Sequence, residues 1–149
     1  MKKTISFIAI LSLIFGVYAF SNSAKAENTY VTLEINPSVE LIVTPSDKVI
    51  YANLLNDDGE TLLVELDLVG MKLDDATNAI IETAIELDFI DATNSETVVT
   101  VSALSKDIKM GEIMRNRVKE NVNGALNRNN VRGRAEDKPE NGYIPDFFN

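Results

Sequence analysis

The feature of the sequence that most limits its fold is an Asn-Pro pair between two stretches of alternating apolar and polar residues. Residues 31–35 read VTLEI and residues 39–43 read VELIV, with Asn36-Pro37-Ser38 between them. Alternation with a period of two is typical of a strand with one buried face, and Asn and Pro both favour turns. The stretch therefore predicts an antiparallel β-hairpin. In a two-residue loop, Pro37 would be the third residue of the turn, where a cis peptide bond is preferred.

Two further strands are predicted from composition and turn signals. Residues 44–48 read TPSDK, a turn-forming cluster, and the segment 49–54 after it would complete a three-stranded antiparallel meander. The run TVVTVSAL at 97–104 is rich in β-branched residues and predicts a fourth strand.

Helical periodicity appears in two places. Apolar residues recur three or four positions apart from Leu73 to Leu87, with Asp74 and Asp75 near the expected N-terminus of a helix. A second helix is predicted for 107–126, and a short helical segment for 60–66. The apolar face of the second helix holds Met110, Met114, Val118, Val122 and Ala125. We expect an α+β fold in β-β-β-α-β-α order, with a four-stranded, mostly antiparallel sheet and two main helices packed on one face.

The two ends of the chain differ in composition from the predicted domain, which spans 29–126. Residues 1–26 begin with Met1-Lys2-Lys3, continue with an apolar run at 5–20 and end in Ala24-Lys25-Ala26, the pattern of a secretory signal peptide. An uncleaved membrane anchor is the alternative. The polar residues 127–149 are predicted to form a disordered tail.

Composition excludes several functional classes. The chain has no Cys and no His, so a disulfide framework, a zinc site and His-dependent hydrolytic triads are not expected. Its net charge is −9, which disfavours nucleic acid as a partner. The oxygen-rich NDDGE at 56–60 lacks the alternating spacing of a calcium loop, so we expect a turn there and neither metal nor cofactor. The basic side chains of the second helix, Lys109, Arg115, Arg117 and Lys119, are expected to be solvated, the alternative being contact with the acidic body of the chain or an anionic partner.

The Asn36-Pro37 bond has an unusual chemistry open to it. Pro37 has no N–H, so its nitrogen cannot attack the Asn36 side chain as in ordinary deamidation. The reverse attack remains, in which the Asn36 carboxamide nitrogen attacks its own backbone carbonyl, closes a succinimide and expels Pro37 as a new N-terminus. This route requires near-attack geometry and stabilisation of the oxyanion. An inert turn is the alternative.

Ser38 offers a second chemistry. Its hydroxyl could attack the Pro37 carbonyl in an N-to-O acyl shift, which would cut between residues 37 and 38. A hydroxyl that caps the turn is the ordinary role of a serine at such a position. Glu34 and Glu40 flank the site and could relay protons, or could be solvated side chains of the polar face.

The block YVTLEINPSVEL at 30–41, followed by NDDG at 56–59, LVG at 68–70 and LDDA at 73–76, resembles the extracytoplasmic middle domain of RsgI-type anti-sigma-I factors of Gram-positive bacteria. The resemblance covers about residues 30–105. It implies self-cleavage at the Asn-Pro-Ser motif, here Asn36, Pro37 and Ser38, with both pieces still paired in the sheet. In that family a signal separates the pieces, which starts proteolysis of the membrane stub and releases the sigma factor.

The chain departs from that family in its N-terminal part. Family members carry a cytoplasmic anti-sigma domain and a transmembrane helix ahead of this domain, whereas four residues precede the apolar run here. We therefore expect a stand-alone exported signalling module with no direct sigma-factor contact and no multi-turnover enzyme activity. Its expected partners are its own N-terminal strand after cleavage and an unknown envelope protein or polysaccharide. The alternative is a non-cleaving secreted binding domain.

Overall fold

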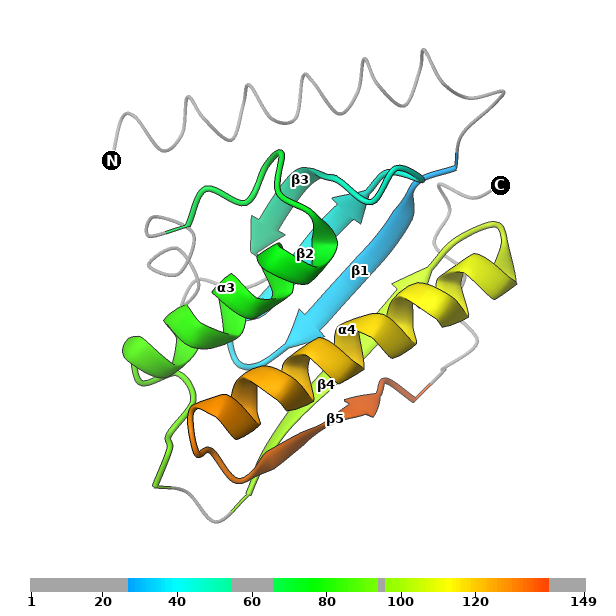
Figure 1. Ribbon diagram of the computed structural model, residues 1–149. Helices are drawn as coiled ribbons and strands as arrows, with labels where there is room; N and C mark the ends of the chain where they lie inside the picture. The colour runs from blue at the N-terminus through cyan, green and yellow to red at the C-terminus, as the bar shows by residue number, and fades with distance from the viewer. Residues whose placement is uncertain (1–26, 55–65, 94–95, 140–149) are drawn as a thin grey trace.

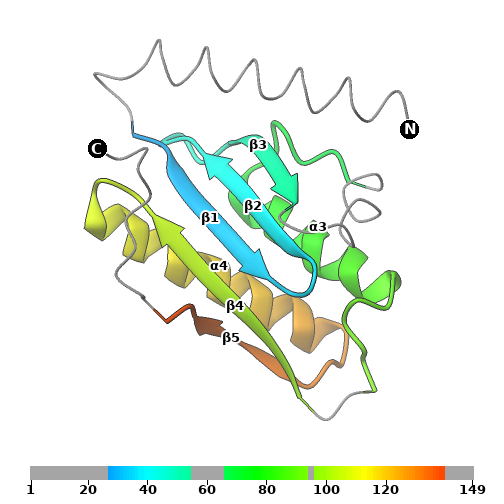
Figure 2. The same cartoon turned by 180° about the vertical axis from the view of Figure 1, so that it is seen from behind.

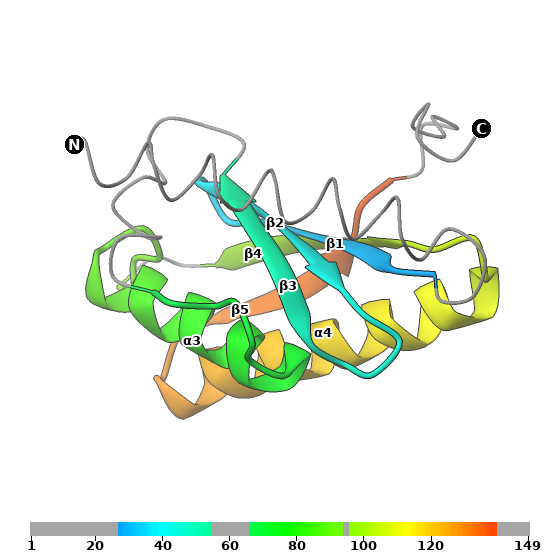
Figure 3. The ribbon, with the colours of Figure 1, turned by 90° about the horizontal axis from the view of Figure 1, so that it is seen from above.

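A computed structural model describes residues 27–54, 66–93 and 96–139 of the chain. The predictions for a helix at 60–66 and a turn at 56–60 fall largely or wholly outside these ranges, as does the extreme C-terminus from residue 140. Within them, the strands form one layer and the helices α3 and α4 form a second layer on one side of it (Figures 1 and 3).

The predicted meander and the fourth strand are confirmed. The meander consists of β1 (Thr29–Glu34), β2 (Ser38–Val43) and β3 (Val49–Leu54). Strand β2 pairs antiparallel with both β1 and β3. Strand β4 (Thr97–Leu104) pairs antiparallel with the other edge of β1. The sheet order is β3-β2-β1-β4-β5, so β1 is the central strand.

Both predicted helices are present and lie on the same face of the sheet (Figure 1). Helix α3 (Leu73–Glu86) has the predicted Asp74 and Asp75 in its first turn, where a carboxylate is favoured by the helix dipole. Helix α4 (Ile108–Arg128) is capped at its N-terminus by Asp107, whose carboxylate accepts hydrogen bonds from the backbone N–H groups of Lys109 and Met110 at 3.0 and 3.2 Å.

The predictions of a four-stranded sheet and of a disordered tail from residue 127 are both wrong for residues 127–137. Helix α4 extends to Arg128, and a fifth strand, β5 (Gly133–Asp137), pairs parallel with β4. The chain reverses at Asn130, whose φ is 56°, and the Val131 N–H donates to the Leu126 carbonyl at 2.9 Å. The sheet is therefore mixed, and α4 is the crossover helix that a parallel pair of neighbouring strands requires.

Polar composition hid β5 because only one of its five residues is buried. Ala135 is buried and the other four residues are exposed. Charged residues on a sheet edge also discourage pairing with another chain. A further contact fixes the strand, since the Ala135 N–H donates to the Asn123 side-chain oxygen on α4 at 2.7 Å.

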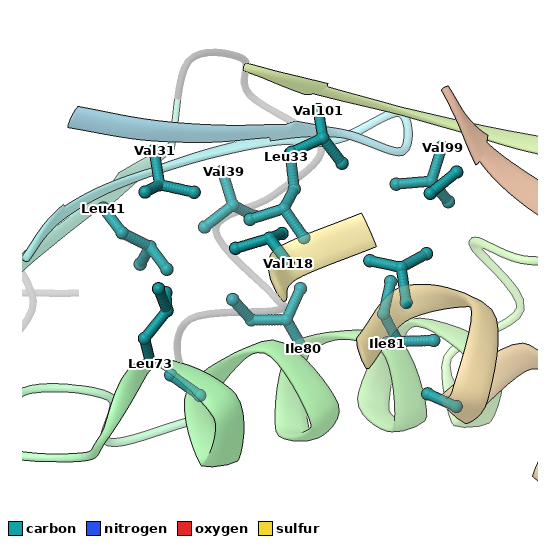
Figure 4. Close-up of a cluster of buried hydrophobic side chains, with 14 of the residues drawn as sticks. Val31, Leu33, Val39, Leu41, Leu73, Ile80, Ile81, Val99, Val101 and Val118 are labelled. Carbon is teal, nitrogen blue, oxygen red and sulfur yellow. The ribbon is translucent and has the colours of Figure 1, made fainter. Parts of the chain in front are cut away.

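The hydrophobic core lies between the sheet and the two helices (Figure 4). Val31 and Leu33 of β1 are 0% exposed and lie at its centre. Burial of side chains of this size stabilises a fold by about 1.5–3 kcal/mol each. Of the predicted apolar face of α4, Met114, Val118, Val122 and Ala125 are buried, and Met110 packs against the core.

The prediction that the basic face of α4 is solvated is wrong for three of its four residues. Arg117 contacts Asp47 and Asp74, while Arg115 and Lys119 both lie within salt-bridge distance of Asp137 on β5. The face binds acidic groups of its own chain, which was the alternative interpretation.

Candidate functional site

The Asn36-Pro37 pair lies in the loop that joins β1 to β2. Glu34 and Ser38 are the last paired residues of the two strands, so the loop has three residues, 35–37, and not the two that were expected. The Ile35 N–H donates to the Pro37 carbonyl at 3.1 Å, which leaves Asn36 alone at the apex. The Asn36-Pro37 peptide bond is cis, the isomer that was expected for a two-residue loop.

Asn36 combines exposure with an uncommon backbone conformation. Its side chain is exposed, whereas Pro37 is buried. Its φ is 76°, in the left-handed region that L-residues adopt at a cost of roughly 1–2 kcal/mol. Asn is among the residues that tolerate this region best. Asn36, whose side chain would attack, therefore has a sterically disfavoured backbone conformation. The paired strands β1 and β2 fix the chain before and after it.

Ser38 begins β2 and is half-buried. Val39 and Leu41 face the core, so the alternation of the strand puts Ser38 on the opposite face of the sheet, beside its cross-strand partner Glu34. Figure 2 shows the sheet from this opposite side, with the helices behind it. Asn36, Pro37 and Ser38 thus form one compact unit with Glu34 next to it.

The two flanking carboxylates are in different surroundings. Glu40 pairs with Thr32, one cross-strand pair farther from the loop than Ser38 on the same face. Burial raises the pKa of Glu40, and a hydrogen bond with Asn53 partly opposes that rise. Glu34 is nearer to the loop and forms an ion pair with Lys138, which follows β5. Of the two, Glu34 is the one placed at the hairpin.

Sequence reasoning missed Lys138, because the residue was assigned to a disordered tail. The available signal was topological: a strand, a long amphipathic helix and a further short segment containing Val131 and Ala135 are the parts of a parallel β-α-β unit. Placing a strand after the helix would have brought Lys138 to the sheet.

The described ranges hold no cluster of three or more metal-binding side chains of the His, Cys, Asp and Glu types. Over the same ranges, no helix combines the length and apolarity needed to cross a bilayer. The apolar run at 5–20 lies outside these ranges.

Comparison with known proteins finds a family whose sequence model covers all the strands and helices described above. The sequence model of the anti-sigma factor RsgI-like central domain matches residues 28–141. The chain is 32% identical over 120 residues to anti-sigma-I factor RsgI6 of Acetivibrio thermocellus, covering 80% of this chain and 16% of that protein. It is 29% identical over 131 residues to anti-sigma-I factor RsgI7 of the same organism, covering 88% of this chain and 24% of that protein.

The chain therefore spans less than a quarter of the length of these relatives. The matched region contains the Asn-Pro-Ser hairpin and, of the described residues, all five strands and both helices. The family resemblance, which covered about residues 30–105, is confirmed, and the match extends through β5. The chain belongs to the family of the anti-sigma factor RsgI-like central domain.

Proposed function

We propose that this chain is a signalling module that cuts itself once, between Asn36 and Pro37, and keeps the severed strand β1 in its sheet. The observation that carries the proposal is the hairpin itself: Asn36 is exposed at the apex with a φ of 76°, and the strands on both sides are fixed by pairing. The relatives bear the name anti-sigma-I factor, and their central domain is the part that this chain shares.

The proposed reaction is an intramolecular acyl transfer. The Asn36 side-chain nitrogen bonds to the Asn36 backbone carbonyl carbon, and the bond from that carbon to the Pro37 nitrogen breaks. The proton lost by the carboxamide is balanced by one gained at the Pro37 nitrogen, which becomes a free secondary amine. The N-terminal piece ends in a succinimide, which water can open because Asn36 is exposed. The loop already holds the attacking nitrogen and the carbonyl close together. This lowers the entropic part of the activation barrier, which an unrestrained chain would have to overcome.

Retention of the cut strand follows from the sheet order. Strand β1 lies between β2 and β4 and is paired with both, so the cut removes no ladder hydrogen bond on either side. Val31 and Leu33 remain buried against the helices. A signal would then act by extracting β1, which exposes the core of residues 37–139.

A second cleavage route is favoured by one contact. The Ile35 N–H donates to the Pro37 carbonyl at 3.1 Å, which is the carbonyl that Ser38 would attack in an acyl shift. A backbone N–H at this distance would stabilise an oxyanion on that oxygen. The two routes differ in the bond that they cut, so the new N-terminus distinguishes them.

The test uses the full chain and two single variants, with N-terminal sequencing and intact mass as readouts. The proposal predicts a fragment that begins at Pro37 in the wild type and in Ser38→Ala, and no fragment in Asn36→Ala. A fragment that begins at Ser38 and is lost in Ser38→Ala would establish the acyl shift. An uncut wild type would leave a binding domain with an inert turn.

We further propose that residues 1–26 direct export and that the described domain functions outside the cytoplasm. If the segment is removed, the mature chain begins at Glu27; if it is kept, β1 tethers the domain to the membrane. The proposed partner outside is an envelope protein or polysaccharide that pulls on the domain. Sequencing the N-terminus of material recovered from the culture medium and from membranes separates these two arrangements.

A further inference from the structure

An ion pair connects the far edge of the sheet to the hairpin. Lys138 follows β5, and its backbone N–H donates to the Val101 carbonyl on β4 at 2.9 Å. Val101 pairs with Leu33 of β1, so Lys138 lies at the level of the last residues of β1. From there its ammonium group reaches Glu34 and forms an ion pair with the carboxylate. The two residues are separated by 104 positions in sequence.

The neighbouring acidic residues of β5 have partners of their own. Glu136 is bound by Arg134, and Asp137 lies within salt-bridge distance of Arg115 and Lys119 on α4. Among these acidic residues, Glu34 is therefore the one that pairs with the ammonium of Lys138. Lys138 belongs to the larger product of the proposed cut and Glu34 to the smaller one, so the pair also spans the two pieces.

Glu34 lies where an uncompensated negative charge would oppose the proposed chemistry. It is the cross-strand partner of Ser38 and is two residues from Asn36. The reaction develops negative charge on the Asn36 carbonyl oxygen, and a nearby carboxylate disfavours such a transition state. A cation bound to that carboxylate offsets its charge and fixes the orientation of its side chain.

We propose that Lys138 is a positioning residue for cleavage at Asn36-Pro37, acting by neutralising and orienting Glu34. This inference rests on the proposed self-cleavage. It assigns a role in the reaction to the segment after β5, more than 100 residues from the bond that is cut, and it makes completion of β5 a condition for fast cleavage.

The experiment measures the rate at which the Pro37 N-terminus appears in newly synthesised full chain, quenched in denaturant at intervals and read by mass. Lys138→Met should slow cleavage about tenfold, the size of effect expected from one uncompensated charge that is partly screened by water. Lys138→Arg should cleave at close to the wild-type rate. Glu34→Gln combined with Lys138→Met should recover most of the lost rate, because no carboxylate remains to be neutralised.

Arg134→Met is the matched control. Arg134 lies on β5, the strand just before Lys138, and its guanidinium pairs with Glu96 and Glu136 and not with the hairpin. Removing this cation should leave the rate unchanged. If Lys138→Met cleaves as fast as the wild type, the inference is wrong and self-cleavage stands. If the double variant stays slow, the contact between the two side chains matters for holding the structure, and charge neutralisation is refuted. If the wild type itself is never cut, the proposed function fails and this inference fails with it.

Discussion

Arg117 on α4 and Asp47 in the turn between β2 and β3 are joined by two hydrogen bonds, from Nη1 to Oδ1 at 2.9 Å and from Nη2 to Oδ2 at 3.0 Å. The same guanidinium also donates to Asp74 in the first turn of α3 at 2.7 Å. One side chain thus connects the sheet and both helices. Asp47 itself has a φ of 69°, so this contact also fixes a turn of unusual backbone geometry.

Replacement of Arg117 by Lys should lower stability by about 1 kcal/mol, because a single ammonium cannot reproduce the paired geometry that a planar guanidinium offers to a carboxylate. Chemical denaturation measures the change. Arg128→Lys is the control, since the contacts of Arg128 with Asn78 and Glu82 are exposed and the substitution should change stability little. Equal effects of the two substitutions would show that Arg117 does not connect the layers.

Gly133→Ala should destabilise the chain by roughly 1–3 kcal/mol through overpacking. A Cβ at this position would lie 2.5 Å from the Thr97 carbonyl oxygen, so β5 would have to move away from β4. At Gly124 on α4 the added Cβ meets only the flexible end of Arg128 at 3.3 Å. Gly124→Ala should therefore stabilise the helix by about 0.5–1 kcal/mol. Thermal unfolding of both variants checks the prediction, and an unaffected Gly133→Ala would contradict the close approach of the two strands.

Glu40→Gln should make the chain more stable at pH 7. Burial raises the pKa of Glu40 in the folded state above the ordinary value of 4.5, so the folded state binds the proton more tightly than the unfolded state. Stability consequently falls as the pH rises from about 4.5 through the raised pKa, and it stays lower above it. Glu40→Gln should not show this fall in stability, because glutamine does not ionise. Melting temperatures at a series of pH values measure it, with Glu112→Gln on the exposed face of α4 as the control for charge.

Thr29→Val should stabilise the chain by about 1 kcal/mol. Thr29 is 0% exposed, and within the described residues its hydroxyl has no hydrogen-bond partner, so a methyl group of similar size removes a desolvation cost. Thr77 is equally buried, but its hydroxyl donates to the Leu73 carbonyl at 2.8 Å. Thr77→Val should bring no such gain. If both substitutions have the same effect on the unfolding midpoint, the hydroxyl of Thr29 is satisfied in solution.

Much of the fold follows from local patterns in the sequence. The alternation at 31–35 and 39–43, the β-branched run at 97–104 and the helical stripes place three strands and two helices correctly, because each of these segments has one buried face. The turn cluster at 44–48 places the fourth predicted strand, β3. Strand β5 lacks such a pattern. It is short, lies at the edge of the sheet and buries only Ala135, so its stability comes from pairing with β4 and from Asn123, which are tertiary contacts.

The candidate site divides in the same way. Asn36, Pro37 and Ser38 are contiguous, so their chemistry and their turn could be inferred from residue types alone. The positive φ of Asn36 and the burial of Pro37 depend on how the loop closes. Lys138 could not be inferred without β5, because only the parallel pairing with β4 brings it level with the end of β1.

The most direct test of the central claim is the mass of the purified wild-type chain in denaturing solvent after long incubation under native conditions. The account predicts a species whose mass corresponds to residues 37–149 with an unmodified Pro37 at its N-terminus, together with a smaller piece that ends at residue 36. A single species with the bond between residues 36 and 37 intact would contradict it.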